Sequence, residues 1–486
     1  MIYKLRPYQE ECVKSISDYI NSDRHDPVLI VGPVGCGKSL LIAEAARLMG
    51  DKALILQPSK ELLQQNHNKI TSYGIPATIY SASCGKKELS NMIYATLGSI
   101  KKVVGQLKEM GIRNVLIDEA HAGYSPEDGS EFMTFMNELK PKKVIGFTAT
   151  PCRLKTMSIG QVSYSQLNFI TRMRPVYFKN LIHVIQVEEM IRQGFWTPLK
   201  YETWDFNGDA LKLNSNGSEY TAESISEAVR KNGLNNLILR RLMVLKDVCR
   251  SILVFMDSVE SCNTAAEWMN AKICAGMAEV VHGGTPKKQR EAIVEGFKSG
   301  KTKVVFNYSA LGTGFDHPGL DCVIVGRPTF SFSSFYQWLG RAVRIKDGKD
   351  SALVVDCCNN SSRFGNIRKL SIENYKGYGW GMFIGDKLIT NIPMGDKVTK
   401  TDLDIKAAKK DRRRGLAQGV TAAPVPGRPD HPLGSTVMTF GKYCGWMFHS
   451  IPVSYFKFIN ETFDWDNDRN KDIKEYIDFL IKNNRL

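Results

Sequence analysis

The chain contains two series of short apolar runs, and within each series helix-length segments separate one run from the next. The first series consists of VLIV from Val28, ALIL from Ala53, ATIY from Ala77, NVLI from Asn114 and KVIGF from Lys143. The second series consists of SILVF from Ser251, AEVVH from Ala278, KVVF from Lys303, CVIV from Cys322 and ALVV from Ala352. Strand-sized runs that alternate with amphipathic helical segments are typical of a parallel sheet covered by helices. We therefore expect an α/β protein with two lobes.

The segments outside these two series predict connections and a small extra domain. Where the strand pattern is lost after the first series, we expect a connector with a helical part and a polar loop. A basic cluster at 409–414, a Gly/Pro-rich stretch after it and aromatic residues beyond Thr436 predict a linker followed by a small α+β domain. The predicted boundaries are 1–152 for the first lobe, 153–240 for the connector, 241–372 for the second lobe, 373–435 for the linker and 436–486 for the C-terminal domain.

Composition excludes several classes of protein. Hydrophobic residues make up 43% of the 486 residues and charged residues 24%, as in ordinary globular proteins. The longest apolar runs, such as Ile252–Met256, are far shorter than the roughly 18 residues that cross a bilayer, and the first residues lack an export signal. The 11 cysteines include no CxxC pair, so we expect neither a disulfide framework nor a CxxC zinc site. We expect a cytoplasmic protein with no membrane partner.

A glycine-rich loop follows the first apolar run directly. Gly32–Ser39 reads GPVGCGKS, which matches the GxxxxGKS pattern between a strand and a helix. Glycines such as Gly32, Gly35 and Gly37 let successive backbone N–H groups surround a phosphate at the helix N-terminus. We expect Lys38 to reach the β and γ phosphates of ATP and Ser39 to bind Mg²⁺. The alternative is a glycine-rich turn with an exposed lysine.

Two carboxylates follow the buried run Val115–Ile117. Asp118 and Glu119 begin the sequence DEAH, which ends at His121. These residues would lie at the end of a strand beside the loop Gly32–Ser39, called the phosphate loop below. There Asp118 would hold Mg²⁺, and Glu119 would orient and deprotonate the attacking water. The alternative is an acidic turn that caps a helix.

The second lobe contains a pair of arginines at helical spacing. In QWLGRAVR, Gln337, Arg341 and Arg344 share one helix face. Two arginines on one face repel each other unless an anion lies between them, and the γ-phosphate of ATP would supply that anion across a cleft. On this hypothesis the arginines act on the triphosphate in cis. Alone, the pattern also fits a solvated basic helix face.

The ordered set of motifs resembles a known family. The set consists of LRPYQ at Leu5–Gln9, GPVGCGKS, QPSKEL at Gln57–Leu62, DEAH, TATP at Thr148–Pro151, GTGFD at Gly312–Asp316 and QWLGRAVR. Over about residues 3–365 the chain resembles superfamily 2 helicases of the DEAH-box type, P-loop NTPases built from two tandem RecA-like lobes. The start LRPYQ, the segment HVIQVEEMIRQGFWTPLKYE and the ending VVDCCNNSSRFG are similar to RadD-like repair helicases and phage branch-migration helicases. Unlike the RadD-like proteins, this chain has no cysteine-rich C-terminal region.

The resemblance implies roles for residues that the chemistry alone does not assign. Arg6 and Gln9 would recognise adenine, Asp316 would lie near the ribose, and His121, Thr148 and Thr150 would couple the nucleotide to lobe movement. It also implies a nucleic-acid track formed by Pro58, Ser59, Lys60, Thr96, Asp257, Ser258, His282, Gly283, Gly312 and Thr313. Small hydroxyls and loop amides suit phosphate contacts, which position a strand without reading its sequence.

Charge and motifs together predict a nucleic-acid motor. The 65 basic side chains exceed the 50 acidic ones, and the net charge of +15 favours a polyanionic partner. We expect an ATP-dependent DNA helicase or translocase that acts on forked or branched DNA in repair, recombination or replication, with branch migration as one activity. A nucleotide-gated RNA or DNA clamp and an RNA helicase without processive unwinding remain open. Most aromatic residues of the tail fit a small hydrophobic core, and exposed ones would serve as a site for bases or a protein partner. A small-molecule kinase would have no use for the arginines of the second lobe.

Overall fold

The computed structural model describes residues 4–50, 52–159, 162–311, 315–407, 433, 436, 438, 443, 447–462 and 471–483. Contacts divide the chain into two compact units. The first unit is Met1–Asn374 with Trp380–Val398, and the second is Tyr375–Gly379 with Thr399–Leu486. Both predicted lobes belong to the first unit.

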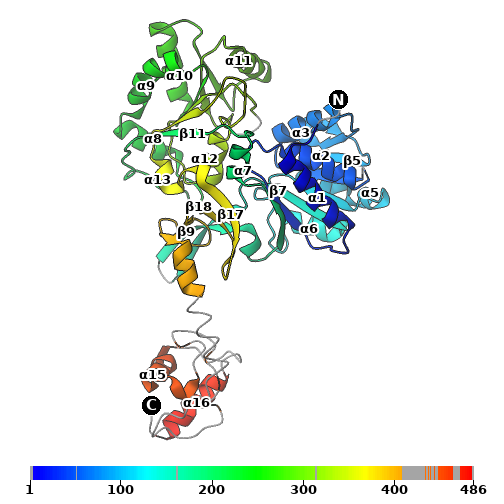
Figure 1. The fold of residues 1–486 in the computed structure, drawn as a ribbon, viewed down its shortest axis with the longest axis vertical. Helices are drawn as coiled ribbons and strands as arrows, with labels where there is room; N and C mark the ends of the chain where they lie inside the picture. Colours follow the sequence, from blue (N-terminus) through cyan, green and yellow to red (C-terminus); the bar gives the residue numbers. More distant parts are fainter. Residues whose placement is uncertain are drawn as a thin grey trace. The chain divides into compact units, whose positions relative to one another are not determined.

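Lobe 1 is built on an eight-stranded sheet in the order β10-β1-β7-β6-β2-β5-β3-β4 (Figure 1). Its strands are β1 (Val28–Val31), β2 (Ala53–Leu56), β3 (Thr78–Ser81), β4 (Lys86–Lys87), β5 (Met92–Ala95), β6 (Asn114–Ile117), β7 (Lys143–Thr148) and β10 (Asn180–Val184). Its helices are α1 (Pro7–Asn21), α2 (Lys38–Leu48), α3 (Lys60–Ser72), α4 (Leu97–Ile100), α5 (Val104–Glu109) and α6 (Glu131–Leu139). All neighbouring strands are parallel except β3 and β4. The central strands are buried on both faces, which is why they read as unbroken apolar runs.

Lobe 2 has a six-stranded parallel sheet in the order β11-β16-β15-β12-β14-β13. Its strands are β11 (Leu199–Thr203), β12 (Ile252–Phe255), β13 (Ala278–His282), β14 (Val304–Tyr308), β15 (Cys322–Val325) and β16 (Ala352–Asp356). Its helices are α8 (Ala222–Lys231), α9 (Leu234–Val248), α10 (Val259–Lys272), α11 (Lys287–Ser299), α12 (Phe332–Leu339) and α13 (Asn360–Phe364). The predicted α/β fold with two tandem lobes is confirmed.

The prediction that residues 153–240 lack strands was wrong. This segment contains most of an antiparallel hairpin, β8 (Cys152–Ile159) and β9 (Val162–Phe169), then β10, the short helix α7 (Val187–Arg192) and β11. Many described side chains of the hairpin, such as Arg153, Lys155 and Gln166, are polar and only partly buried or exposed, so these strands gave no apolar run. Strands β10 and β11 extend the two main sheets, and α8 and α9 pack on the core of lobe 2.

The linker predicted from residue 373 also begins too early. A four-stranded sheet of β17 (Leu370–Tyr375), β18 (Gly379–Ile384), β19 (Lys387–Leu388) and β20 (Val398–Thr399) occupies that region. Two of these strands are only two residues long, too short for a pattern in the sequence to reveal them. The basic cluster at 409–414 and the Gly/Pro-rich stretch up to residue 432 lie outside the described residues.

The second unit has a small hydrophobic core of its own. This core is formed by the 3-10 turn η6 (Phe448–Ser450) and the helices α15 (Val453–Thr462) and α16 (Lys471–Lys482). Phe448, Phe456 and Tyr476 are buried in it. Most aromatic side chains described there therefore pack inside, whereas Phe458 is 57% exposed. Among the described helices of the whole chain, none is both long and apolar enough to cross a membrane.

Candidate nucleotide site between the lobes

The phosphate loop connects β1 to α2. Gly35 and Gly37 have positive φ values of 83° and 85°, which residues with a Cβ rarely adopt. A Cβ at Gly37 would also lie 2.5 Å from Nε2 of Gln9. Helix α2 begins at Lys38 without a side-chain cap at Gly37, so the first backbone N–H groups of the helix are available to an anion.

The first acidic residue lies directly after β6. Asp118 is 4% exposed, and its Oδ1 accepts a hydrogen bond of 2.9 Å from the Glu119 backbone N–H. Asn66 of α3 donates from Nδ2 to Asp118 Oδ2 at 2.8 Å, and its Oδ1 accepts from Ser39 Oγ at 2.6 Å. Asn66 thus joins Ser39 to Asp118. The sequence alone did not predict a role for Asn66, although its place on the helix face of Leu63 and Ile70 was a signal.

The lysine and carboxylates are close enough to influence one another. Lys38 Nζ lies 3.7 Å from Glu119 Oε1. Burial lowers the pKa of Lys38, but nearby charges, that of Glu119 foremost, outweigh burial and raise the pKa overall. Burial, followed by the charge of Glu119, raises the pKa of Asp118 to about 7. Glu119 itself has a φ of 45°, a strained conformation for a residue other than glycine.

The donor set suits a magnesium ion. Ser39 and Asp118 supply the hydroxyl and carboxylate oxygens that Mg²⁺ prefers, and the remaining ligands in such sites are usually water and substrate phosphates. The Asn66 bridge holds both side chains beside Lys38. These residues therefore fit the ion predicted from the sequence.

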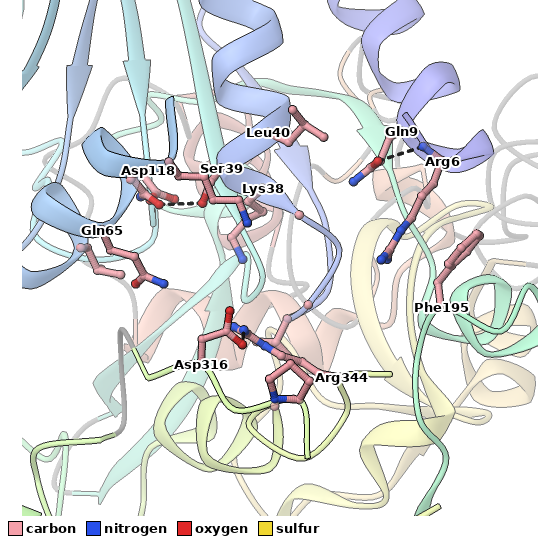
Figure 2. A pocket seen from close by; sticks show the side chains of 18 of the residues that line it. Arg6, Gln9, Lys38, Ser39, Leu40, Gln65, Asp118, Phe195, Asp316 and Arg344 are labelled. Atoms are coloured by element: carbon pink, nitrogen blue, oxygen red, sulfur yellow. Dashed lines mark hydrogen bonds and ion pairs between the residues drawn. The ribbon is translucent and has the colours of Figure 1, made fainter. Parts of the chain in front are cut away.

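The arginine-bearing segment of lobe 2 lines the same cavity as the phosphate loop. This cavity has a volume of about 490 Å³, within the usual range for small-molecule sites. Its lining includes Lys38, Ser39, Asp118 and Glu119 from lobe 1, and Asp316, Gln337, Arg341 and Arg344 from lobe 2. Figure 2 shows Lys38 and Asp118 on one side and Arg344 with Asp316 on the other. A Cβ on Gly340 would lie 2.5 Å from Cγ2 of Val34, so the two lobes are in contact here.

The two arginines have different partners. Arg341 donates to the Phe315 carbonyl oxygen at 2.7 Å, and burial lowers its pKa to about 10, against the effect of the Glu119 charge. Burial also lowers the pKa of Arg344 to about 10, and this side chain forms an ion pair with Asp316. The anion that the sequence argument required beside Arg344 is therefore a carboxylate of the protein itself. Asp316 still lines the cavity, but its carboxylate is turned to this arginine.

The predicted adenine residues lie at the other end of the cavity (Figure 2). Gln9 accepts a hydrogen bond from the Arg6 backbone N–H at 2.9 Å and donates from Nε2 to the Cys36 carbonyl oxygen at 2.9 Å. Tyr8 is buried and donates from its hydroxyl to the same carbonyl oxygen at 3.2 Å, so it helps to fix the position of the loop. The Arg6 guanidinium lies 4.6 Å from the ring centroid of Phe195, an aromatic wall that the sequence analysis did not assign to the site.

The residues predicted to couple the nucleotide to movement form one hydrogen-bond chain. His121 contacts Thr148 Oγ1 through Nδ1 at 2.8 Å and Ser333 Oγ through Nε2 at 3.0 Å. Thr150 Oγ1 lies 3.2 Å from the same serine oxygen. Ser333 belongs to α12, so this chain crosses from lobe 1 to lobe 2. Burial lowers the pKa of His121, which favours the neutral ring. Sequence reasoning missed Ser333 because its partners are distant along the chain.

The predicted nucleic-acid residues lie at strand ends and helix starts. Ser59 and Ser258 are the N-caps of α3 and α10, and Thr96 precedes α4. The others in the described part of the chain are Pro58 before Ser59, Lys60 at the start of α3, Asp257 after β12, His282 at the end of β13 and Gly283 after it. Gly312 and Thr313 lie outside the described residues.

Family comparisons agree with this geometry. Residues 2–153 match the domain described as type III restriction enzyme, res subunit, and residues 235–346 match the helicase conserved C-terminal domain. The chain belongs to superfamily 2 of the helicases. The two matched domains belong to the two lobes that line the cavity.

Individual relatives are distant. This chain is 25% identical over 332 residues to the 51.5 kDa protein of Lactococcus phage (isolate 7-9), covering 68% of this chain and 65% of that one. It is 25% identical over 376 residues to the ATP-dependent DNA helicase Hel308 of Pyrococcus horikoshii, covering 69% of this chain and 49% of that one. The chain therefore spans about half to two thirds of the length of these relatives. The ATP-dependent Type ISP restriction-modification enzyme LlaBIII bound to DNA shares the fold, with a TM-score of 0.54 at 14% identity over 86% of this chain and 30% of that one.

Proposed function

We propose that this helicase hydrolyses ATP in the cavity between its lobes and uses the cycle to move along or unwind DNA. The observation that carries the proposal is the shared lining of one cavity: a lysine and two carboxylates come from lobe 1, and two arginines come from lobe 2. A triphosphate in this cavity would contact both lobes, so its hydrolysis would change their attraction. A pocket on a single lobe would have no such effect.

The proposed chemistry assigns each side chain a task. Lys38 and the N–H groups at the start of α2 bind the phosphates, while Arg6, Gln9 and Phe195 hold the base. Glu119 orients the attacking water and accepts its proton. A magnesium ion held by Ser39 and Asp118 would neutralise phosphate charge.

The arginines are proposed to act on the charge that develops during hydrolysis. Arg341 already lies within electrostatic range of Glu119. Arg344 would exchange its Asp316 partner for the γ-phosphate, which leaves Asp316 free to reach the ribose. Loss of the γ-phosphate would restore the ion pair and weaken the contact between the lobes. Repeated closing and opening moves the lobes along a strand held by the N-caps Ser59 and Ser258.

DNA is the proposed polymer because two of the similar proteins have names or titles that mention DNA. Hel308 is a DNA helicase by name, and the LlaBIII structure contains DNA. Forked or branched DNA, branch migration and a place in repair, recombination or replication remain part of the proposal. A clamp on RNA or DNA would show ATP hydrolysis stimulated by nucleic acid without strand displacement.

The test measures ATP hydrolysis and strand displacement side by side on single strands, forks, four-way junctions and RNA duplexes. Lys38→Ala and Glu119→Gln should each abolish hydrolysis, and Glu119→Gln should retain ATP binding because its amide keeps the shape of the carboxylate. Normal turnover by Glu119→Gln would exclude this residue as the base. Stimulation without displacement on every substrate would favour the clamp.

A further inference from the structure

A second cavity, of about 580 Å³, lies between the β8–β9 hairpin and lobe 2. The hairpin contributes Thr156, Tyr164 and Ser165, and lobe 2 contributes Phe330 and Arg363. None of its described lining residues belongs to the nucleotide cavity. The backbone N–H of Met394, another lining residue, donates to the Ser165 carbonyl oxygen of β9 at 2.8 Å. The volume is within the range of nucleotide-sized sites.

The chemistry of this cavity combines aromatic faces with one cation. Tyr164 and Phe330 are each partly exposed, and among the described lining residues Arg363 is the one charged side chain. The Arg363 guanidinium lies 5.3 Å from the Phe330 ring centroid and donates to the Thr329 carbonyl oxygen at 2.8 Å. The ring and the cation are thus held together. Aromatic faces beside a cation are the means by which proteins bind single-stranded nucleic acid without reading its sequence.

The nearby carboxylate of Glu219 is occupied by hydrogen bonds to residues other than Arg363. The Glu219 carboxylate is already an acceptor for Thr329 Oγ1 and for the Phe330 backbone N–H, the latter at 2.7 Å. Thr156, Ser165 and Asn214 add small hydroxyl and amide groups to the lining. Such groups suit phosphate and sugar contacts.

Both walls of the second cavity continue into the nucleotide site. Helix α12 begins two residues after Phe330 and carries Gln337 into the nucleotide cavity. On the other wall, β8 begins just after Thr150, and its Arg153 donates to the carbonyl oxygens of His121 at 2.7 Å and Tyr124 at 2.6 Å. One wall is tied to the DEAH loop of lobe 1 and the other belongs to lobe 2. Movement of the lobes would therefore change the width of the second cavity.

We propose that this second cavity binds one or two nucleotides of a single strand, with a base against Tyr164 and Phe330 and a phosphate against Arg363. The inference rests on the proposed function, since it assumes that the helicase acts on nucleic acid. It adds a second strand-binding site, separate from the N-cap residues of the two lobes, whose width changes during the nucleotide cycle.

The experiment is photocrosslinking of the full chain to an oligothymidylate that carries 5-iododeoxyuridine, followed by mass spectrometry of the linked peptides. We expect links to Tyr164 or Phe330. Tyr164→Ala should weaken the Kd for the unmodified oligonucleotide about tenfold, because base–aromatic stacking of typical strength is lost. Tyr164→Phe keeps the ring and should restore the affinity. Trp268→Ala, which removes an exposed ring from α10, is the matched control and should leave the Kd unchanged.

The outcomes separate this inference from the proposed function. If the wild-type chain binds no oligonucleotide, the proposed function is wrong. If it binds, but links fall elsewhere and Tyr164→Ala binds normally, only the second cavity is excluded as a strand site. If thymidine monophosphate removes the links while the oligonucleotide stays bound, the cavity is a site for free nucleotides, which also overturns the inference.

Discussion

Replacing Gly340 with alanine tests the contact between the lobes with a single methyl group. Gly340 is the C-cap of α12, with a φ of −61° and a ψ of −11°, a conformation that alanine adopts readily. The backbone therefore does not oppose the substitution. The added Cβ would lie 2.5 Å from Cγ2 of Val34 and 2.8 Å from its Cβ, on the phosphate loop of the other lobe.

The expected magnitude follows from that overlap. An extra methyl group in a packed contact costs about 1–3 kcal/mol. This cost applies only to the arrangement in which the two lobes are in contact at Gly340 and Val34. Each 1.4 kcal/mol lowers the population of that arrangement about tenfold relative to one with the lobes apart. The kcat/KM for ATP should therefore fall at least about fivefold in Gly340→Ala, while the thermal midpoint stays close to that of the wild type.

The assay is steady-state ATP hydrolysis at saturating nucleic acid. Val34→Gly removes the colliding Cβ together with both methyl groups, so the double variant Gly340→Ala/Val34→Gly should recover most of the lost activity. Gly105→Ala is the matched control, because a Cβ at this helical glycine meets no atom within 4 Å. Full activity of Gly340→Ala, or a loss that Val34→Gly does not relieve, would refute closure of the lobes through this contact.

Two further predictions concern coupling and pH. Ser333→Ala removes the hydroxyl that contacts His121 across the cleft, so kcat for ATP should fall about fivefold with ATP affinity retained, as expected for loss of about 1 kcal/mol of hydrogen bonding. The neighbouring Ser334→Ala is the control, and equal effects of the two variants would contradict a special role for Ser333. His317, which is 5% exposed and hydrogen-bonded to Ser251, has its pKa lowered from 6.5 to about 4, chiefly by burial and then by nearby lysines. Because the unfolded chain binds this proton first, the stability that the neutral ring provides is complete above pH 6.5 and is lost as the pH falls towards 4, by up to about 3 kcal/mol. The urea midpoint should therefore drop less in His317→Gln than in the wild type between pH 7 and pH 4.5, and identical drops would exclude this histidine as a cause.

The parts of the fold that the sequence predicts are those with local causes. The phosphate loop was predictable because its glycines, lysine and serine are contiguous and follow an apolar strand. The two main sheets were predictable because strands buried on both faces have few polar residues. These features need no knowledge of distant contacts.

The remaining features depend on contacts between distant segments. The contacts of Asn66 with Asp118 and of Ser333 with His121 depend on the fold. Of the two residues, only Asn66 had a signal in the sequence, through its place on the buried face of α3. The β8–β9 hairpin was missed because its strands carry Arg153 and other polar residues at positions that a buried strand would fill with apolar ones. The ion pair that holds Arg344 is equally a product of tertiary structure.

The most direct test of the shared nucleotide site is ATP hydrolysis by Arg341→Ala and Arg341→Lys, measured together with ATP binding. The account predicts that both variants bind ATP and that hydrolysis falls about a thousandfold or more, since an arginine that acts on the transferred phosphate contributes at least that much. Arg240→Ala, on the exposed face of α9, is the control for loss of a positive charge. Hydrolysis by both Arg341 variants at the wild-type rate would contradict the claim that lobe 2 completes the site.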